Sequence, residues 1–166
     1  MQTLFRGRSA VVLLGIAFVV ADQLVKLLAL SALQAGGFRL GARPVSLALE
    51  LSLNPGAFLS LGAAMPEWVK QMIFVLGVAG VVGWAGYWAL RNWAVSTRQA
   101  MAVYAIALGG AGNLIDRVFR HGHVVDYMII NVGSLHTGVF NLADIAITAG
   151  ALFLALDMLR TPRPGP

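Results

Sequence analysis

Acidic and amide side chains gather in one stretch of an otherwise apolar chain, between residues 109 and 150. This stretch contains three of the seven acidic residues of the protein, Asp116, Asp126 and Asp144. The amides and the cation that accompany them are Asn113, Arg117 and Asn141. Carboxylates at the border of membrane-like segments are costly and usually functional. We therefore expect the chemistry of the protein in this stretch.

Asp126 and Asp144 are of the type and spacing needed for acid–base chemistry on water. Asp126 lies in the β-branched and aromatic run HVVDYMII, and a glycine-containing loop separates it from Asp144, which opens the next apolar segment. That loop can fold Asp126 back over the start of the helix. Two neighbouring carboxylates cannot both ionise cheaply, so one keeps a proton while the other acts as a base. This is the requirement of an aspartic peptidase, in which water is activated and the scissile carbonyl polarised.

Each of these acids also has a structural interpretation. Asn141 and Asp144 have the spacing of a capping box, and an acid in the first turn of a helix favours the helix dipole in any case. Asp126 is flanked by apolar residues, and its expected desolvation favours a functional role. For Asp116 and Arg117, beside Asn113, we expect a pairing and hydrogen-bond network that closes the third apolar segment.

Asp22 and Lys26 form a second polar pair, near the end of the first apolar segment. They stand four residues apart, so one helical turn brings them to the same face. Because ions within a membrane segment usually pair, we expect mutual neutralisation here rather than direct chemistry.

Two other kinds of site have weaker support. His121 and His123 could join Asp126 in a metal site, but the motif is short and lacks the helical HExxH arrangement. A serine hydrolase would have to use Ser60 or Ser134, and neither lies in a nucleophile-elbow motif. We expect no metal and no cofactor, and the absence of cysteine excludes thiolate chemistry and disulfides.

Composition indicates one integral membrane domain over residues 1–166. The chain is 58% hydrophobic and only 11% charged, which is outside the range of soluble domains. Its formal net charge of +5 is scattered along the sequence. This distribution suits loops that face anionic lipid headgroups and argues against nucleic-acid binding.

The apolar segments predict a bundle of four transmembrane helices. Their ranges are about 9–30, 67–90, 100–115 and 140–159. Four spans place both termini on one side, and the distribution of Lys and Arg leans weakly towards cytoplasmic termini. Within the second span, Gly77, Gly80, Gly83 and Gly86 predict close packing against a neighbouring helix.

A small antiparallel β region is expected over residues 38–62, outside the bundle. Residues 45–54 alternate apolar and polar or small side chains, which predicts a half-buried strand. Pro55 and Gly56 after Asn54 suit a type II turn, and residues 57–61 would return as the second strand of a hairpin. Residues 36–40 could add a neighbouring strand. Such a hairpin should lie on the membrane surface, with its apolar side towards the bilayer or a bound chain.

Five motifs, in this order along nearly the whole chain, resemble those of lipoprotein signal peptidases, also called signal peptidase II. They are Asp22-x-x-x-Lys26, Asn54-x-Gly56, the GGAGNLIDR run that contains Asn113, Asp116 and Arg117, the VVDY run that contains Asp126, and the FNLAD run that contains Asn141 and Asp144. Each motif alone is unspecific, whereas the five at these spacings are strong.

The resemblance implies a multi-pass aspartic endopeptidase of the bacterial inner membrane, with cytoplasmic termini, a β-cradle and an active site at the outer face. Its substrate would be a prolipoprotein with a diacylglyceryl-modified cysteine, cut just before that cysteine. Asp126 and Asp144 would be the catalytic pair. Residues that shape or support the site would be Asn54, Gly56, Asn113, Arg117, Asn141, Asp22, Lys26 and Asp116. Membrane lipids and globomycin-type inhibitors would also bind, and we expect a monomer.

The chain departs from the family pattern after the strand. Family members commonly have the aromatic residue of N-x-G-A-A-F-S one place later than Phe58, and side chains alternate across a strand. The shift affects the expected cradle and not the acid pair. The alternative function from another class is a small membrane transporter or proton-relay subunit that uses the membrane-border carboxylates. Convergence of Asp126 and Asp144 at one interface, away from mid-span, disfavours it.

Overall fold

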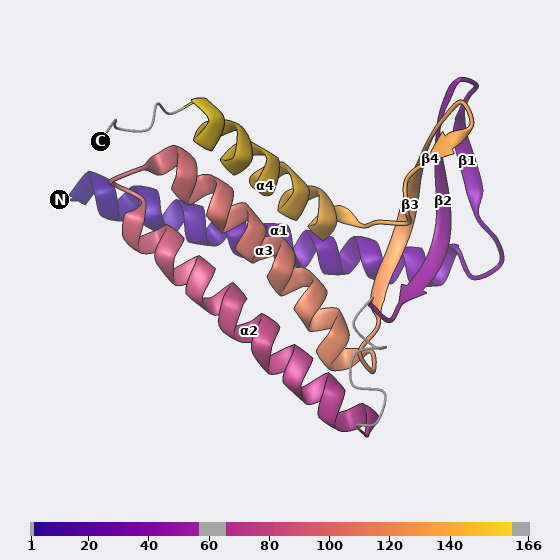
Figure 1. Cartoon of the computed structure of the whole chain (residues 1–166), viewed down its shortest axis with the longest axis horizontal. Helices are drawn as coiled ribbons and strands as arrows, with labels where there is room; N and C mark the ends of the chain where they lie inside the picture. The colour runs from indigo at the N-terminus through magenta and orange to yellow at the C-terminus, as the bar shows by residue number, and fades with distance from the viewer. Residues whose placement is uncertain (1, 57–65, 161–166) are drawn as a thin grey trace.

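The structure, a computed structural model, describes residues 2–56 and 66–160. Within these residues the chain forms a helical bundle and, at one end of it, a small sheet (Figure 1). The elements in order are α1 (Gln2–Ala32), β1 (Phe38–Ala42), β2 (Val45–Asn54), α2 (Glu67–Asn92), α3 (Thr97–Phe119), β3 (Val124–Val132), β4 (Leu135–His136) and α4 (Leu142–Arg160).

Among residues 2–56 and 66–160, three helices are long and apolar enough to cross a membrane. These segments are Ser9–Ala32, Gln71–Asn92 and Leu142–Arg160. Most of their side chains are not buried in the protein, and large apolar residues such as Leu14, Trp84 and Leu156 are exposed. An apolar surface of this kind is suited to lipid. The sequence prediction placed these spans at 9–30, 67–90 and 140–159, in close agreement.

The third helix differs from its prediction. The expected span at 100–115 is part of α3, which runs from Thr97 to Phe119 and is 23 residues long. The helix continues through Asp116 and Arg117 because partners from other elements stabilise its last turns, as described below. The last turns of α3 therefore carry three of the polar residues named from the sequence, Asn113, Asp116 and Arg117.

Small residues bring α3 and α4 close together. A Cβ atom added to Gly109 would clash with the carbonyl oxygen of Ala143, and one added to Gly150 would lie 2.6 Å from that of Ala102. The prediction of close packing by the glycines of α2 is wrong for Gly77, Gly80 and Gly83, which have no atom within 4 Å of an added Cβ in the described structure. Those three glycines lie on open parts of α2. The spacing of glycines in the sequence does not show which face of a helix packs against a neighbour, and the prediction failed for this reason.

The sheet has the order β1-β2-β3-β4, with every neighbouring pair antiparallel. Strand β2 has the predicted bounds, and β1 overlaps the predicted strand at 36–40. The predicted return strand at 57–61 lies outside the described residues, together with Phe58 and Ser60. On the described chain, β2 instead pairs with β1 on one side and with β3 on the other.

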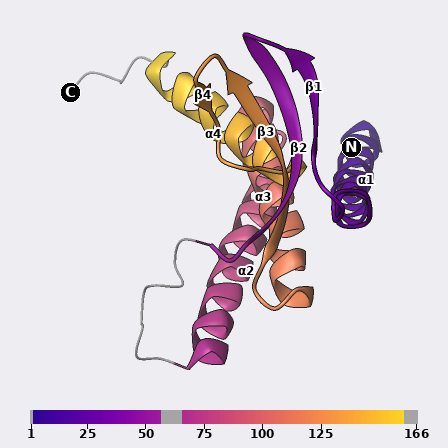
Figure 2. The ribbon, with the colours of Figure 1, turned by 90° about the vertical axis from the view of Figure 1, so that its right-hand side faces the viewer.

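The chain between β3 and α4 doubles back, as predicted from its glycine-containing loop. Phe140 and Met128 exchange two backbone hydrogen bonds, each 2.9 Å long. This bridge brings the start of α4 next to β3, and the two views show both elements meeting at the junction of sheet and bundle (Figures 1 and 2). The folded-back loop thus positions Asp126 and Asp144 for the same site.

Candidate active site

Asp126 is almost completely buried, with 2% of its surface exposed. It projects from β3, where it pairs in register with Ser52 of β2. Two residues further along β2, on the same face, Asn54 donates from Nδ2 to Asp126 Oδ2 at 2.9 Å. Asn141 Nδ2 donates to the other oxygen at 2.7 Å. Both oxygens of this carboxyl therefore accept a hydrogen bond from an amide.

Asp144 lies in the first turn of α4 and is half-buried. Its Oδ2 accepts from the backbone N–H of Asn141 at 3.1 Å, while its own N–H donates to Asn141 Oδ1 at 3.0 Å. These reciprocal bonds form the capping box expected from the sequence. The remaining oxygen, Oδ1, accepts from Asn113 Nδ2 at 2.8 Å. The capping role and a role in the site are thus compatible, because they use different oxygens.

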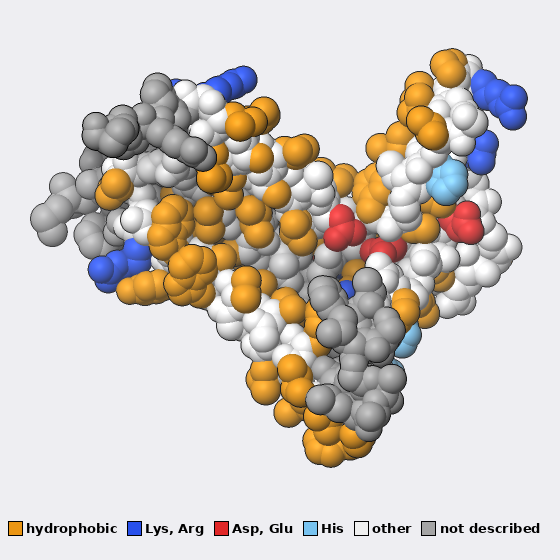
Figure 3. Space-filling view, viewed as in Figure 1, with side chains coloured by type: hydrophobic (Ala, Val, Ile, Leu, Met, Phe, Trp, Pro, Cys, Tyr) orange, Lys and Arg blue, Asp and Glu red, His pale blue; other side chains and the backbone are white. Residues whose placement is uncertain are grey.

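Asn113 and Asn141 connect the two carboxyl groups. Asn141 Nδ2 donates to Asn113 Oδ1 at 3.1 Å and also reaches Asp126, while Asn113 serves Asp144. A continuous chain of hydrogen bonds therefore runs from one acid to the other through two amides. Acidic side chains lie at the base of the hollow between the helices and the sheet, amid hydrophobic groups (Figure 3).

Burial alters the acidity of the groups on β3. Desolvation raises the pKa of Asp126, and the nearby charge of Asp144 raises it further, against the lowering effect of the hydrogen bonds from Asn54 and Asn141. Desolvation also raises the pKa of Tyr127 to about 12, so this phenol stays neutral. A carboxyl with a raised pKa beside a second carboxyl is the arrangement in which one proton is retained by the pair.

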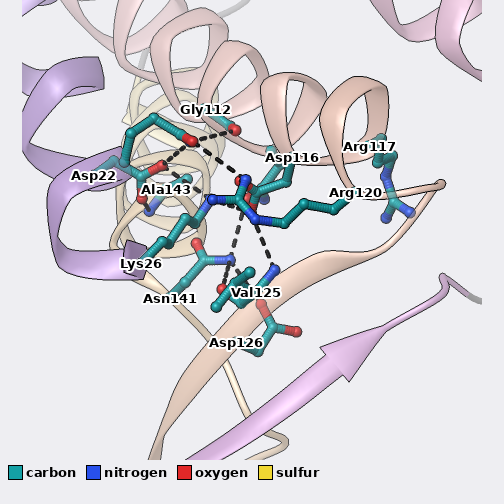
Figure 4. A network of polar contacts seen from close by, with 12 residues as sticks. Asp22, Lys26, Gly112, Asp116, Arg117, Arg120, Val125, Asp126, Asn141 and Ala143 are labelled. Carbon is teal, nitrogen blue, oxygen red and sulfur yellow. Dashed lines mark hydrogen bonds and ion pairs between the residues drawn. The ribbon is translucent and has the colours of Figure 1, made fainter. Parts of the chain in front are cut away.

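A buried ion cluster supports this site from behind (Figure 4). Lys26 Nζ lies 2.9 Å from Asp22 Oδ2 and 3.0 Å from Asp116 Oδ2, and all three side chains are fully buried. Asp22 Oδ1 accepts from the N–H of Ala143 at 3.1 Å, which ties α1 to the positive end of α4. Asp22 and Lys26 do pair, as predicted, but the cluster includes Asp116 from α3 as well.

The predicted pairing of Asp116 with Arg117 is wrong. Asp116 pairs with Lys26 and with Arg120, and it accepts the backbone N–H of Val125 at 3.0 Å. Consecutive residues of a helix point in different directions, whereas residues four apart share a face. Arg120 was absent from the sequence prediction, although its spacing from Asp116 is the same signal that identified Asp22 and Lys26.

Arg117 turns towards the chain that follows β2. Its guanidinium donates to the carbonyl oxygen of Gly122 at 2.7 Å and to that of Pro55 at 3.3 Å, and it lies 4.8 Å from the ring centre of Phe74. Gly56 lies beside this guanidinium and has φ of +85°, the positive value that the predicted turn requires. Gly56 N–H donates to Asn54 Oδ1 at 2.8 Å. The turn and Arg117 together hold Asn54 against Asp126.

Gly56→Ala is expected to lower the free energy of unfolding by about 1–2 kcal/mol, because an L-residue is strained at positive φ. The added Cβ would also stand 3.2 Å from Arg117 Nη1 and Nη2. Unfolding in detergent micelles measures the change. Gly138→Ala is the control, since an added Cβ there has no atom within 4 Å. Equal stability of the two variants would contradict a strained turn.

An apolar pocket of about 480 Å³ opens beside Asp144. It lies between β3, the loop that follows β4, and α4. Its apolar lining includes Ile130, Val139, Phe140, Ile145, Ala149 and Leu152. A carboxyl at the edge of an apolar pocket can meet the polar part of a ligand whose remainder is hydrophobic.

The other candidate groups are not assembled into sites on the described chain. His121 and His123 lie in the turn after α3, where His123 Nδ1 is 3.0 Å from the carbonyl oxygen of His121. No cluster of three potential metal-binding side chains is found in residues 2–56 and 66–160. Ser134 is exposed in the turn between β3 and β4.

The known proteins that this chain is similar to belong to the family that its polar motifs resemble. The family model described as "Signal peptidase (SPase) II" matches residues 14–160. The lipoprotein signal peptidase of Ralstonia nicotianae is 36% identical over 90% of this chain and 84% of its own length. That of Cupriavidus taiwanensis is 39% identical over 74% of this chain and 69% of its own length.

Solved structures agree on the fold. A bacterial membrane enzyme determined at 2.3 Å resolution superposes with a TM-score of 0.72 at 22% sequence identity, over 95% of each chain. A second structure of a bacterial membrane enzyme, at 1.9 Å resolution, gives a TM-score of 0.66. The family match extends over all five motifs and both candidate acids, and the chain therefore belongs to the signal peptidase II family.

Proposed function

We propose that this protein is a membrane-embedded aspartic endopeptidase that removes signal peptides from diacylglyceryl-modified prolipoproteins. The cut falls just before the lipidated cysteine. The observation that carries the proposal is the hydrogen-bonded chain Asp126–Asn141–Asn113–Asp144, which joins two carboxyl groups in a desolvated site. The names of the relatives, lipoprotein signal peptidases, supply the substrate class.

Asp126 and Asp144 act as a pair that shares one proton. The ionised carboxylate removes a proton from water as the water oxygen attacks the scissile carbonyl carbon, and the protonated carboxyl donates to the carbonyl oxygen. The tetrahedral intermediate then collapses as the C–N bond breaks: the carboxyl that took the water proton gives it to the leaving nitrogen, and the other carboxylate takes the proton of one hydroxyl as the carbonyl re-forms, so the pair again holds one proton. The amides of Asn54, Asn113 and Asn141 hold the two carboxyl groups during these steps and donate to whichever oxygens carry charge.

The surroundings of the pair suit a lipid-linked peptide. The apolar pocket beside Asp144 accepts hydrocarbon or apolar side chains, and the apolar helices allow approach from the bilayer. We infer that α3 crosses the membrane as a fourth span, with the termini in the cytoplasm of a bacterium and the site at the outer face of its inner membrane. The sheet then forms the cradle on that face, and the enzyme works as a monomer that globomycin-type peptides block.

Incubation of the purified protein with a diacylglyceryl-modified precursor peptide tests the proposal. We expect a single cut before the modified cysteine, with and without a chelator, and no cut in the same peptide without lipid. Cleavage lost on chelation would refute the metal-free mechanism. Intact lipidated peptide together with dissipation of an ion gradient in proteoliposomes would instead support the transporter function.

Asn54→Ala is expected to move the pH profile of cleavage to higher pH. The Asn54 amide stabilises the ionised form of Asp126, so its loss raises the pKa of that carboxyl and the pair loses its first proton at higher pH. The acidic limb of kcat/KM therefore shifts upwards. Asn92→Ala is the control, because Asn92 bonds the carbonyl oxygen of Trp88 in α2. A profile of Asn54→Ala that coincides with the wild type would contradict the role of this bond.

A further inference from the structure

Lys26 makes a third contact that charge neutralisation does not require. Besides its two carboxylate partners, its ammonium donates to Asn113 Oδ1 at 2.9 Å. All three N–H bonds of the ammonium are thus used, on a side chain that is fully buried. The contact connects the ion cluster to the amide chain between Asp126 and Asp144.

The contact determines which way the Asn113 amide points. A lysine ammonium is a donor only, so the Asn113 atom that faces it must be the oxygen. Asn141 Nδ2 donates to the same oxygen. The amide nitrogen of Asn113 then has to point away, towards Asp144 Oδ1 at 2.8 Å. If the Asn113 amide were flipped, its NH₂ group would face the donors of Lys26 and Asn141, and its oxygen would face the Asp144 carboxylate.

We propose that Lys26 is a positioning residue for the catalytic pair. By bonding the oxygen of the Asn113 carboxamide, it orients the Asn113 nitrogen to donate to Asp144. The same Asn113 oxygen accepts from the Asn141 amide, which also donates to Asp126. The inference rests on the proposed function for its catalytic consequence. The orientation of the amide itself is a property of the protein that is measurable without substrate.

Arg120 provides a matched control for the alternative that Lys26 only stabilises the fold. Like Lys26, it is a cation paired with Asp116, and it also contacts Gln23. It makes no hydrogen bond with Asn113 among the described contacts. Loss of Arg120 therefore removes one charge from the cluster and leaves the amide chain in place. Loss of Lys26 removes one charge and also the donor that orients the Asn113 amide.

The test compares Arg120→Met with a charge-balanced double variant, Asp22→Asn with Lys26→Met. The asparagine introduced by Asp22→Asn keeps an oxygen for the Ala143 N–H, and no unpaired acid is left at that position. Protein labelled with ¹⁵N at asparagine reports hydrogen exchange of the Asn113 side-chain amide by NMR in micelles. Cleavage of the lipidated peptide reports kcat and KM separately.

We expect the double variant to exchange the Asn113 amide protons at least tenfold faster than the wild type. Its kcat should fall at least tenfold with KM within about twofold, because the substrate surface is unchanged. Arg120→Met should keep both the slow exchange and kcat, although its melting temperature falls. Unchanged exchange and kcat in the double variant, or an equal loss in Arg120→Met, would overturn the proposal.

A chemical rescue covers the case in which the double variant does not fold. The chain has no cysteine, so Lys26→Cys can be alkylated at one position in the denatured state before reconstitution. Bromoethylamine rebuilds an ammonium of lysine length, and bromopropane builds an uncharged side chain of the same length. Only the ammonium form should restore slow exchange and kcat. A wild-type protein that leaves the lipidated peptide intact would refute the proposed function, while the exchange measurement still decides the positioning of Asn113.

Discussion

Asp126→Asn and Asp144→Asn are each expected to lower kcat by about 10⁴-fold, at the upper end of what general acid–base groups contribute. Asparagine keeps the shape of the side chain but has one acceptor oxygen instead of two, so one of the two N–H donors at each position loses its partner, which lowers stability without removing the side chain. The asparagine amide neither takes a proton from water nor gives one up to the carbonyl oxygen at the pH of the assay. The readout is cleavage of the diacylglyceryl-modified precursor peptide, with unfolding in micelles measured in parallel.

Asp157→Asn is the matched control for this pair. Asp157 belongs to the same helix as Asp144 but lies about 20 Å further along it, at a rise of about 1.5 Å per residue. It accepts from Gln99 Nε2 at 2.7 Å, and an asparagine oxygen can replace it in that bond. We expect wild-type kcat in this variant. Turnover within tenfold of wild type in Asp126→Asn or Asp144→Asn would refute the assignment of the catalytic pair.

Asp116→Ala is expected to lower the free energy of unfolding by about 3–5 kcal/mol, the range found when one partner of a buried ion pair is removed. Asp116 is fully buried and accepts from Lys26, Arg120 and the N–H of Val125. Its removal leaves Lys26 with one carboxylate and leaves the Val125 N–H unpaired in the interior. Unfolding by heat or by denaturing detergent measures the loss.

Two further variants separate charge from hydrogen bonding at this position. Asp116→Asn keeps an oxygen for the Val125 N–H, so its loss of stability should be smaller than that of Asp116→Ala. Glu50→Ala removes an exposed acid of β2 and should stay within about 0.5 kcal/mol of the wild type. If Asp116→Ala were as stable as Glu50→Ala, the ion cluster would not be what holds α1, α3 and β3 together.

Features that depend on residues close together in the chain can be predicted from the sequence. The three apolar helices, strand β2 and the pairing of Asp22 with Lys26 follow from the sequence, since each depends on a period or a spacing within one element. The turn at Gly56 and the capping box of Asn141 with Asp144 are local in the same sense. These features were predicted correctly because the residues that make them are neighbours in the chain.

The partners of the polar residues were decided only by the tertiary structure. Asn54 meets Asp126 across 72 residues because of the register of β2 and β3, and Lys26 meets Asn113 across 87 because of the packing of α1 on α3. The sequence does not show in which direction each side chain points, and so it predicts Arg117 as the partner of Asp116, whereas the partners are Lys26 and Arg120. In a desolvated interior each buried donor and acceptor needs a partner, and only the assembled elements determine which partner is within reach.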